Sequence, residues 1–313
     1  MTMIRSLRAN LAAGLTVGLT RAVGLAALCL LAMPAVAAAG VAGTAERPTR
    51  TPPPVLDVTI TAAGFEIPGA NPRPSGLTTF RVSTPEPKGM WLALLRPKPD
   101  STWERVIKAF DDSASPDPAV ALQGVRDQYR YADFAGGVAV FPGRPVSFTE
   151  RLTPGRYYLV GTSQQGGAHL QTLDVGEDRV EATPPRIDGI IRIVGTDRPR
   201  FVMPSRLPAN GTFLVINDSS IPQEAVFART VPGATFSTVQ NYFDAQREGR
   251  PLPPNPLVAT VAGMLAISPG RSAIVHADFE PGRYSVLSFL MEPENGVKQA
   301  YLGLHREFDF LVK

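Results

Sequence analysis

The chain has 313 residues, enough for about two domains, and 44% of them are apolar, enough for ordinary globular cores. Its 31 Pro and 28 Gly favour a β-rich fold with many turns. The net charge of +3 comes from three Arg in the first 39 residues, and the rest holds 28 basic and 28 acidic residues. This balance excludes the strongly positive surface on which nucleic-acid binding depends, so we expect no nucleic-acid partner.

The N-terminus has the pattern of a secretory signal. Arg5 and Arg8 precede an apolar stretch that is uninterrupted from 22 to 31, and small residues with an Ala-x-Ala cleavage pattern follow up to Ala39. We predict that residues 1–39 are a signal peptide and that the mature protein is secreted or periplasmic. An uncleaved membrane anchor is the alternative, but ten apolar residues are short for a span. We therefore expect no stable membrane span after cleavage.

Cysteine usage excludes several chemistries. The one Cys of the chain, Cys29, lies inside the predicted signal. The mature chain is therefore expected to hold no disulfide, no thiolate metal site and no thiol nucleophile.

A proline-rich linker is predicted at 40–54, ending in three consecutive Pro. Directly after it, Leu56, Val58 and Ile60 alternate with other residues, the period of a half-buried strand.

An internal repeat organises the remaining chain. Leu77-Thr-Thr-Phe80-Arg-Val matches Gly211-Thr-Phe213-Leu-Val at an offset of 133 residues, and the same offset relates Arg96 to Arg229. Two Pro-Gly-Arg motifs, 142–144 and 269–271, and two Pro-Gly-Arg-Tyr motifs, 154–157 and 281–284, share an offset of 127. One offset before a loop and another after it indicate a duplication with a length change. We predict two complete domains, 55–180 and 187–313, joined around 176–186.

A helix is predicted within a long excursion of each copy, which runs from about 97 to 135 in the first and from about 230 to 262 in the second. Ser101-Thr-Trp-Glu104 has the form of a capping box, and Trp103, Val106, Ile107 and Phe110 form one apolar stripe. In the second copy Phe236, Val239 and Phe243 repeat that stripe.

The order of strands, a helical excursion and a Pro-Gly-Arg-Tyr entry to the closing strands resembles bacterial secreted cupredoxin-like domains, which are related to plastocyanin. The resemblance covers nearly the whole mature chain, once per copy. It implies an all-β fold of two tandem Greek-key β-sandwich domains, each with one short helix in its excursion.

The same resemblance implies positions for copper ligands, which in that family are two His, one Cys and one Met. In the second copy these positions hold Gln223, Ser288, Gln299 and Leu304. The first copy holds Met90, Gly161 and His169 at matching places and offers no axial Met. Blue copper needs a thiolate and two imidazoles, so we expect a degenerate copper site, no bound metal and no cofactor. In the second copy Gln223, Ser288 and Gln299 are expected to converge in a hydrogen-bonded plug.

We predict that the protein is not an enzyme. Only three His follow the signal, which excludes the paired His clusters of multicopper oxidases and nitrite reductases, and there is no Gly-x-Ser-x-Gly nucleophile motif. The predicted function is an exported binding or interaction protein. The alternative is a metal-handling protein that carries copper transiently through Met90, Met203, Met264, Met291, His169 and His305.

The partner is expected to be an unidentified envelope or extracellular protein. Tyr129, Tyr131 and Phe134 in the first excursion are interleaved with Arg, and Tyr and Arg are the residue types that anchor interfaces. The alternative for these three aromatic residues is that they cover the open end of the sandwich.

Overall fold

The computed structural model describes residues 51–69, 71–163 and 168–312. The predicted signal peptide and most of the predicted linker lie outside these residues. The last linker residues are held against the sheet, because the carbonyl groups of Thr51 and Pro54 accept hydrogen bonds from the amides of Thr183, at 2.8 Å, and Thr79, at 2.9 Å.

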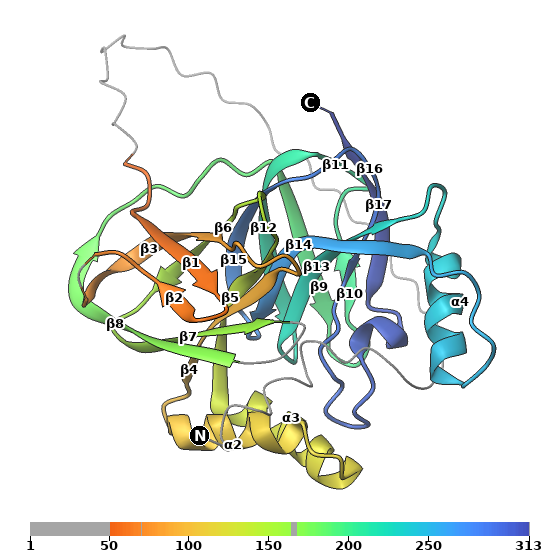
Figure 1. The fold of residues 1–313 in the computed structure, drawn as a ribbon, viewed down its shortest axis with the longest axis horizontal. Coiled ribbons are helices and arrows are strands. Elements are labelled where there is room, and N and C mark those ends of the chain that lie inside the picture. The colour runs from red at the N-terminus through yellow and green to blue at the C-terminus, as the bar shows by residue number, and fades with distance from the viewer. Residues whose placement is uncertain (1–50, 70, 164–167, 313) are drawn as a thin grey trace, which may run out of the picture.

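The described residues of the first half contribute eight strands and two helices (Figure 1). The strands are β1 (Val55–Thr61), β2 (Gly64–Glu66), β3 (Arg73–Ser83), β4 (Met90–Pro97), β5 (Ala132–Val140), β6 (Val146–Leu152), β7 (Gly155–Ser163) and β8 (Ala168–Val180). The helices α2 (Trp103–Ser113) and α3 (Pro118–Tyr131) lie between β4 and β5. Burial alternates along β1, as the spacing of its apolar residues predicts.

The second half contributes nine strands, one α-helix and one 3₁₀ helix. The strands are β9 (Gly189–Gly195), β10 (Arg200–Val202), β11 (Arg206–Pro208), β12 (Asn210–Ser219), β13 (Gln223–Thr230), β14 (Leu257–Ile267), β15 (Ser272–Asp278), β16 (Gly282–Leu287) and β17 (His305–Leu311). The helix α4 (Phe236–Arg247) follows β13, and the 3₁₀ helix η1 (Gln299–Leu302) precedes β17.

The two halves share one pattern of strand pairing. In the first half β1 pairs with β2 and β3, β3 with β6 and β8, and β4 with β5 and β7, which in turn pairs with β8. The second half repeats these pairings in the same order and with the same parallel or antiparallel sense. The strands that correspond to β1 to β8 are, in turn, β9, β10, β11–β12, β13, β14, β15, β16 and β17. The all-β, cupredoxin-like fold class is therefore confirmed.

Two antiparallel strand pairs join the halves. β5 pairs with β14, and β6 pairs with β15, so that the hydrogen-bonded strand pairing continues from one half into the other. In the β6–β15 pair, Phe148 lies opposite Val275, and these residues occupy the same place in the two repeats. The junction therefore has an approximate twofold relationship that passes through the Phe148–Val275 pair. The main core cluster also contains residues of both halves, including Phe80, Phe148, Phe213 and Phe308.

The helical excursions differ from the prediction in one respect. The first helix begins after Thr102, whose hydroxyl accepts a hydrogen bond from the amide of Arg105. A second helix, α3, follows at once, where the sequence analysis expected a single short helix per copy. Asp117 caps α3 through the amides of Ala119 and Val120, and Pro118 stands in its first turn, so the start of α3 was readable from local sequence. None of the described helices is both long and apolar enough to cross a membrane.

Candidate functional site

The four positions that the resemblance assigns to copper ligands in the second half are all buried. Exposed fractions are 0% for Gln223 and Ser288 and 1% for Gln299 and Leu304. Gln223 begins β13, and Ser288 follows β16 directly. Gln299 begins η1, and Leu304 directly precedes β17. The ends of three neighbouring strands therefore bring these residues to one end of the sandwich.

Ser288 is the centre of this group. Its hydroxyl donates a hydrogen bond of 2.7 Å to Oε1 of Gln223, and its amide donates to the carbonyl of Leu304 at 3.3 Å. Gln299 is joined to the group through its backbone, since its carbonyl accepts from the amide of Leu304 at 2.9 Å. The side-chain amide of Gln299 instead donates to Glu292. The side chains of Gln223 and Ser288 thus meet directly, whereas that of Gln299 turns away.

This donor set does not fit copper. A hydroxyl that donates to an amide oxygen replaces a thiolate, and Leu304 offers no donor atom. The side-chain nitrogen Nε2 of Gln223 is buried without a hydrogen-bond partner, which leaves one unsatisfied polar atom in the group.

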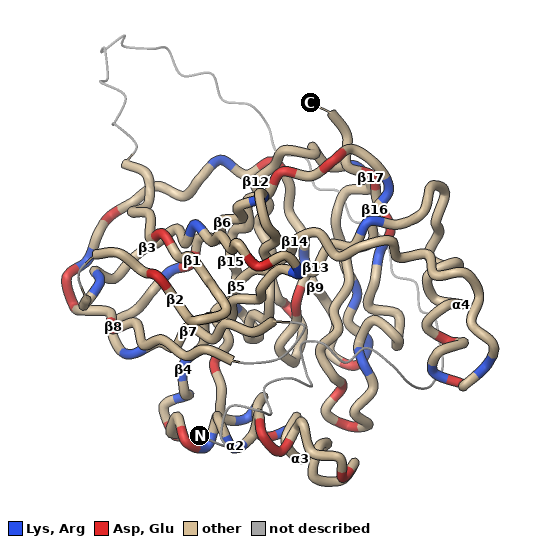
Figure 2. The backbone as a smooth tube through the Cα atoms, viewed as in Figure 1, with Lys and Arg blue, Asp and Glu red and all other residues tan. Residues whose placement is uncertain are grey.

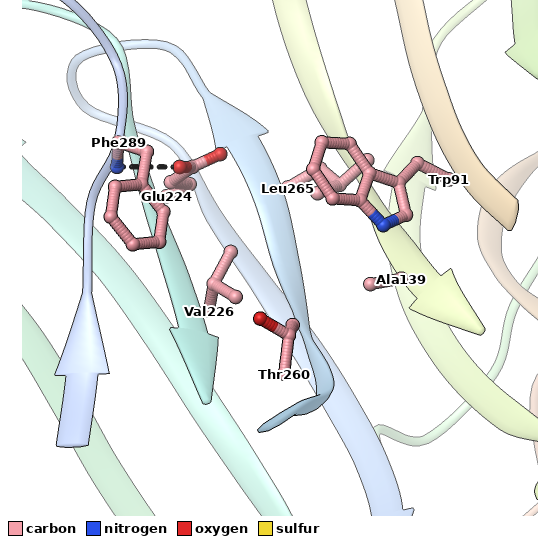
Figure 3. Close-up of a pocket in the computed structure, with 7 residues that line it drawn as sticks. All are labelled: Trp91, Ala139, Glu224, Val226, Thr260, Leu265 and Phe289. Carbon is pink, nitrogen blue, oxygen red and sulfur yellow. Dashed lines mark hydrogen bonds between the residues drawn. The ribbon is translucent and has the colours of Figure 1, made fainter. Parts of the chain in front are cut away.

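A small cavity lies beside this group, between the two halves (Figure 3). Its volume is about 40 Å³, enough for a water molecule, and its lining residues are Trp91, Ala139, Glu224, Val226, Thr260, Leu265 and Phe289. One carboxylate oxygen of Glu224 accepts a hydrogen bond of 2.6 Å from the amide of Phe289. The indole nitrogen of Trp91 is buried without a hydrogen-bond partner.

Several titratable groups next to Gln223 and Gln299 have shifted pKa values. Burial raises the pKa of Glu224 to about 7, and burial lowers the pKa of Lys298, which interacts electrostatically with Glu224, to about 8. Burial also raises the pKa of Glu292, although the hydrogen bond from Gln299 opposes this shift. The sequence analysis did not select Glu224 or Lys298, because neither belongs to a motif.

In the first half the matching positions lie on the neighbouring strands β4, β7 and β8, but their side chains do not form a site. Met90 is 2% exposed and belongs to the main core cluster. Gly161 lies opposite His169 in the β7–β8 pair, and a Cβ at Gly161 would meet the ring of Phe65 at 2.9 Å. The aromatic ring of Phe65 therefore occupies the space in front of Gly161.

The three aromatic residues proposed as a partner contact have different environments. Phe134 is 5% exposed and belongs to a core cluster beneath α2 and α3, which corrects its assignment as a contact residue. Tyr129 packs edge-on against Phe134, and its hydroxyl donates a 2.7 Å hydrogen bond to the carbonyl of Met291. Tyr131 is half-buried, with the guanidinium groups of Arg105 and Arg130 within 5.7 Å and 5.5 Å of its ring centre.

The helix α3 therefore holds the segment that carries the second-half site. In addition to the Tyr129 bond, Nε of Arg126 donates to the carbonyl of Pro293 at 2.7 Å, and Leu290 packs into the cluster around Phe134. The aromatic and arginine side chains that suggested an external partner thus make part of an internal contact between residues more than 160 positions apart.

The Met and His residues of the metal-handling alternative are dispersed. Met90, Met203 and Met264 lie in the main core cluster. His305 is 3% exposed, and its two ring nitrogens lie 3.0 Å from Glu307 and 3.0 Å from Gln240. Within the described parts of the chain, no three His, Cys, Asp or Glu residues are grouped so that they could hold a metal ion.

Three comparisons with known proteins were informative to different degrees. No protein-family model and no curated protein sequence matches it. Among solved structures it is similar to auracyanin B, with 18% identity, 42% of this chain and 93% of that one covered, and a TM-score of 0.26. A multicopper oxidase matches with 11% identity, coverage of 83% and 88%, and a TM-score of 0.22. A copper-containing nitrite reductase from Thermus scotoductus matches with 10% identity, coverage of 83% and 61%, and a TM-score of 0.21.

These comparisons correct the prediction that the chain is not an enzyme. The solved structures to which it is similar include multicopper oxidases, laccases and a nitrite reductase. The loss of one chemistry from the sequence does not exclude another, because function resides in sites placed on a fold.

Proposed function

We propose that the chain is an exported binding protein built from two cupredoxin-like domains, 55–180 and 187–313, neither of which holds copper. The constant offsets of the sequence repeat and the duplicated strand pairings support the two domains. β8 extends to Val180, so the connection between them begins later than Gly176, the first residue of the expected junction.

The observation that carries this proposal is the hydrogen bond from Ser288 to Gln223. Both side chains are fully buried, and the hydroxyl of Ser288 is paired with Oε1 of Gln223 at the place where the resemblance puts a thiolate and an imidazole. A buried hydroxyl–amide pair stabilises the fold by about 1 kcal/mol, so selection for structure alone can maintain it. The end of the second domain is then a structural plug, and a binding function must use other surfaces.

The partner contact proposed on the first excursion is restricted to Tyr131. Its ring is half-buried beside two guanidinium groups, and Tyr and Arg are residue types that anchor interfaces, whereas Phe134 and the hydroxyl of Tyr129 are used internally. The occupant we propose for this surface is an envelope or extracellular protein.

The experiment combines two measurements on the mature protein purified from its native envelope. Elemental analysis should find no stoichiometric copper. Site-specific photocrosslinking from position 131 should yield one defined adduct. Excess wild-type protein should compete this adduct away, whereas excess Tyr131→Ala protein should not, and the melting temperature of that variant should stay within about 1–2 °C of the wild type. Stoichiometric copper would refute the copper-free domains, and crosslinking equal to that from an exposed control position such as Arg192 would refute the contact surface.

A further inference from the structure

A cleft opens at the junction of the two halves and is lined by residues of both. Its volume is about 330 Å³, and its lining residues are Gly143, Arg144, Pro145, Val146, Val261, Ala262, Ala277, Asp278, Phe279 and Glu280. The floor is apolar, since Val146, Ala262, Ala277 and Phe279 are exposed by 5% or less. The rim carries the charged side chains of Arg144, Asp278 and Glu280, each of them exposed.

The approximate twofold relationship gives this cleft a counterpart that the protein fills itself. Glu150 lies two residues beyond Phe148 on β6, and Ala277 lies two residues beyond Val275 on β15, so the two positions are equivalent. Glu150 is 3% exposed and accepts a 2.8 Å hydrogen bond from Nη1 of Arg271. At the cleft a methyl group stands where the counterpart has this carboxylate side chain.

The arginines around the two places are also equivalent, but their carboxylate partners are not. In the filled place Arg96 and Arg271 bind Asp133, and Arg271 binds Glu150 as well. At the cleft Arg229 and Arg144 share Glu280 alone. Two guanidinium groups thus have two acid partners on one side of the junction and one on the other.

Arg144 has hydrogen-bonding capacity left over. Its Nη2 donates to Glu280 at 2.6 Å, and within the described residues neither its Nε nor its Nη1 has a protein partner. In the counterpart the equivalent Nη1 of Arg271 is the atom that binds Glu150. By analogy, a carboxylate placed at the position of Ala277 would be bound by Arg144, and Arg144 has unpaired donors within the described residues.

We propose that this cleft binds a small monocarboxylate with an apolar body. The carboxylate would be held by Arg144, as Glu150 is held by Arg271, and the apolar part would cover Val146, Ala262 and Phe279. Charge-assisted hydrogen bonds from Arg to a carboxylate are the strong kind, and a cleft of this size suits a short aliphatic or single-ring acid. Asp278 and Glu280 on the rim oppose a second negative charge on the ligand. This inference rests on the proposed binding function and names its ligand class.

The first experiment titrates 3-phenylpropionate and hexanoate into the full mature protein, with the corresponding primary amides as neutral controls, and follows backbone NMR shifts. We expect saturable shifts at Val146 and Ala277 with the acids and at least about tenfold weaker binding of the amides. A tripeptide that ends in Phe, with a free or an amidated C-terminus, distinguishes the source of the carboxylate. If the free peptide binds more tightly than the small acids, the ligand is a polypeptide C-terminus; if it binds more weakly, the ligand is a free acid.

Two variants test the geometry. Ala277→Glu should place a carboxylate in the cleft as Glu150 does in the counterpart, and Arg144→Gln should remove the cation; each should weaken binding at least about tenfold. Arg156→Gln removes an exposed arginine paired with Asp174, and neither residue lines the cleft, so this variant should bind as the wild type does. The proposal is overturned if the acids cause no saturable shifts, if the amides bind equally well, or if Arg144→Gln binds as tightly as the control. Copper analysis, which tests the proposed function, does not depend on any of these outcomes.

Discussion

Arg144 and Arg271 follow equivalent Pro-Gly turns, and each reaches across the junction to the opposite half of the molecule. Arg271 binds Asp133 at 2.6 Å and Glu150 at 2.8 Å, whereas Arg144 binds Glu280 at 2.6 Å. The two side chains also differ in exposure, since that of Arg271 is 20% exposed and that of Arg144 is 46% exposed. The duplicated motif therefore supplies one half-buried and one exposed contact between the halves.

This difference predicts unequal effects of the same substitution. Arg271→Gln leaves the half-buried carboxylate of Asp133 with Arg96 as its remaining cation, removes the hydrogen bond to buried Glu150, and should lower the free energy of unfolding by about 3 kcal/mol. Arg144→Gln breaks an exposed pair and should change it by less than about 1 kcal/mol. Urea denaturation of both variants checks this prediction. Equal losses would show that the two contacts are energetically equivalent.

The hydroxyl of Tyr129 should stabilise the attachment of the 288–304 segment to α3. Tyr129→Phe removes the hydrogen bond to Met291 and should cost about 1 kcal/mol, with faster amide exchange at 289–298. Tyr131→Phe is the matched control, since its described contacts are made by the ring. If amide exchange at 289–298 is unchanged in Tyr129→Phe, the hydrogen bond does not stabilise the attachment of this segment.

Ser288→Ala should destabilise the fold by about 1–3 kcal/mol, because it leaves the buried amide of Gln223 without its remaining side-chain partner. The double variant Ser288→Ala, Gln223→Leu removes both polar groups and should recover part of that loss. Thermal denaturation of the single and double variants gives the coupling between the two positions. Additive losses would contradict a direct bond between them.

Glu224 should make stability depend on pH. Its pKa is about 7 in the folded chain, against an ordinary value of 4.5, so the folded state binds this proton more tightly than the unfolded state does. Stability from this group is fully present below about pH 4.5 and is lost as pH rises to about 7, by at most about 3 kcal/mol. Glu150, whose pKa burial raises to about 8, adds a loss of the same sign.

Glu224→Gln should therefore be more stable than the wild type at pH 8 and should show a smaller decrease in stability between pH 4.5 and 7. Urea denaturation across this range measures both quantities. The charge on Lys298 does not complicate this window, because its pKa of about 8 leaves it protonated throughout. A variant with the wild-type pH profile would assign the dependence to Glu150 instead.

The parts of the fold that depend on local sequence were predictable. The alternation in β1, the Pro-Gly turns before β7 and β16, and the apolar stripe of α2 all encode their structures over a few residues. The cap of α3 at Asp117 was equally local but was not recognised. The burial of Phe134 and the bond from Tyr129 to Met291 could not be read in this way, because they depend on how the second half packs against the first. The same holds for Glu224 and the arginine contacts across the junction.

Copper binding by the wild type and by a ligand-restored variant tests the central claim most directly. The variant combines Gln223→His, Ser288→Cys, Gln299→His and Leu304→Met, and circular dichroism verifies that it is folded. With one equivalent of Cu(II), the wild type should remain colourless, and the variant should bind one copper and develop an intense visible thiolate-to-copper band. Stoichiometric copper in the wild type, or a folded variant that binds none, would contradict the assignment of these four positions to a lost copper site.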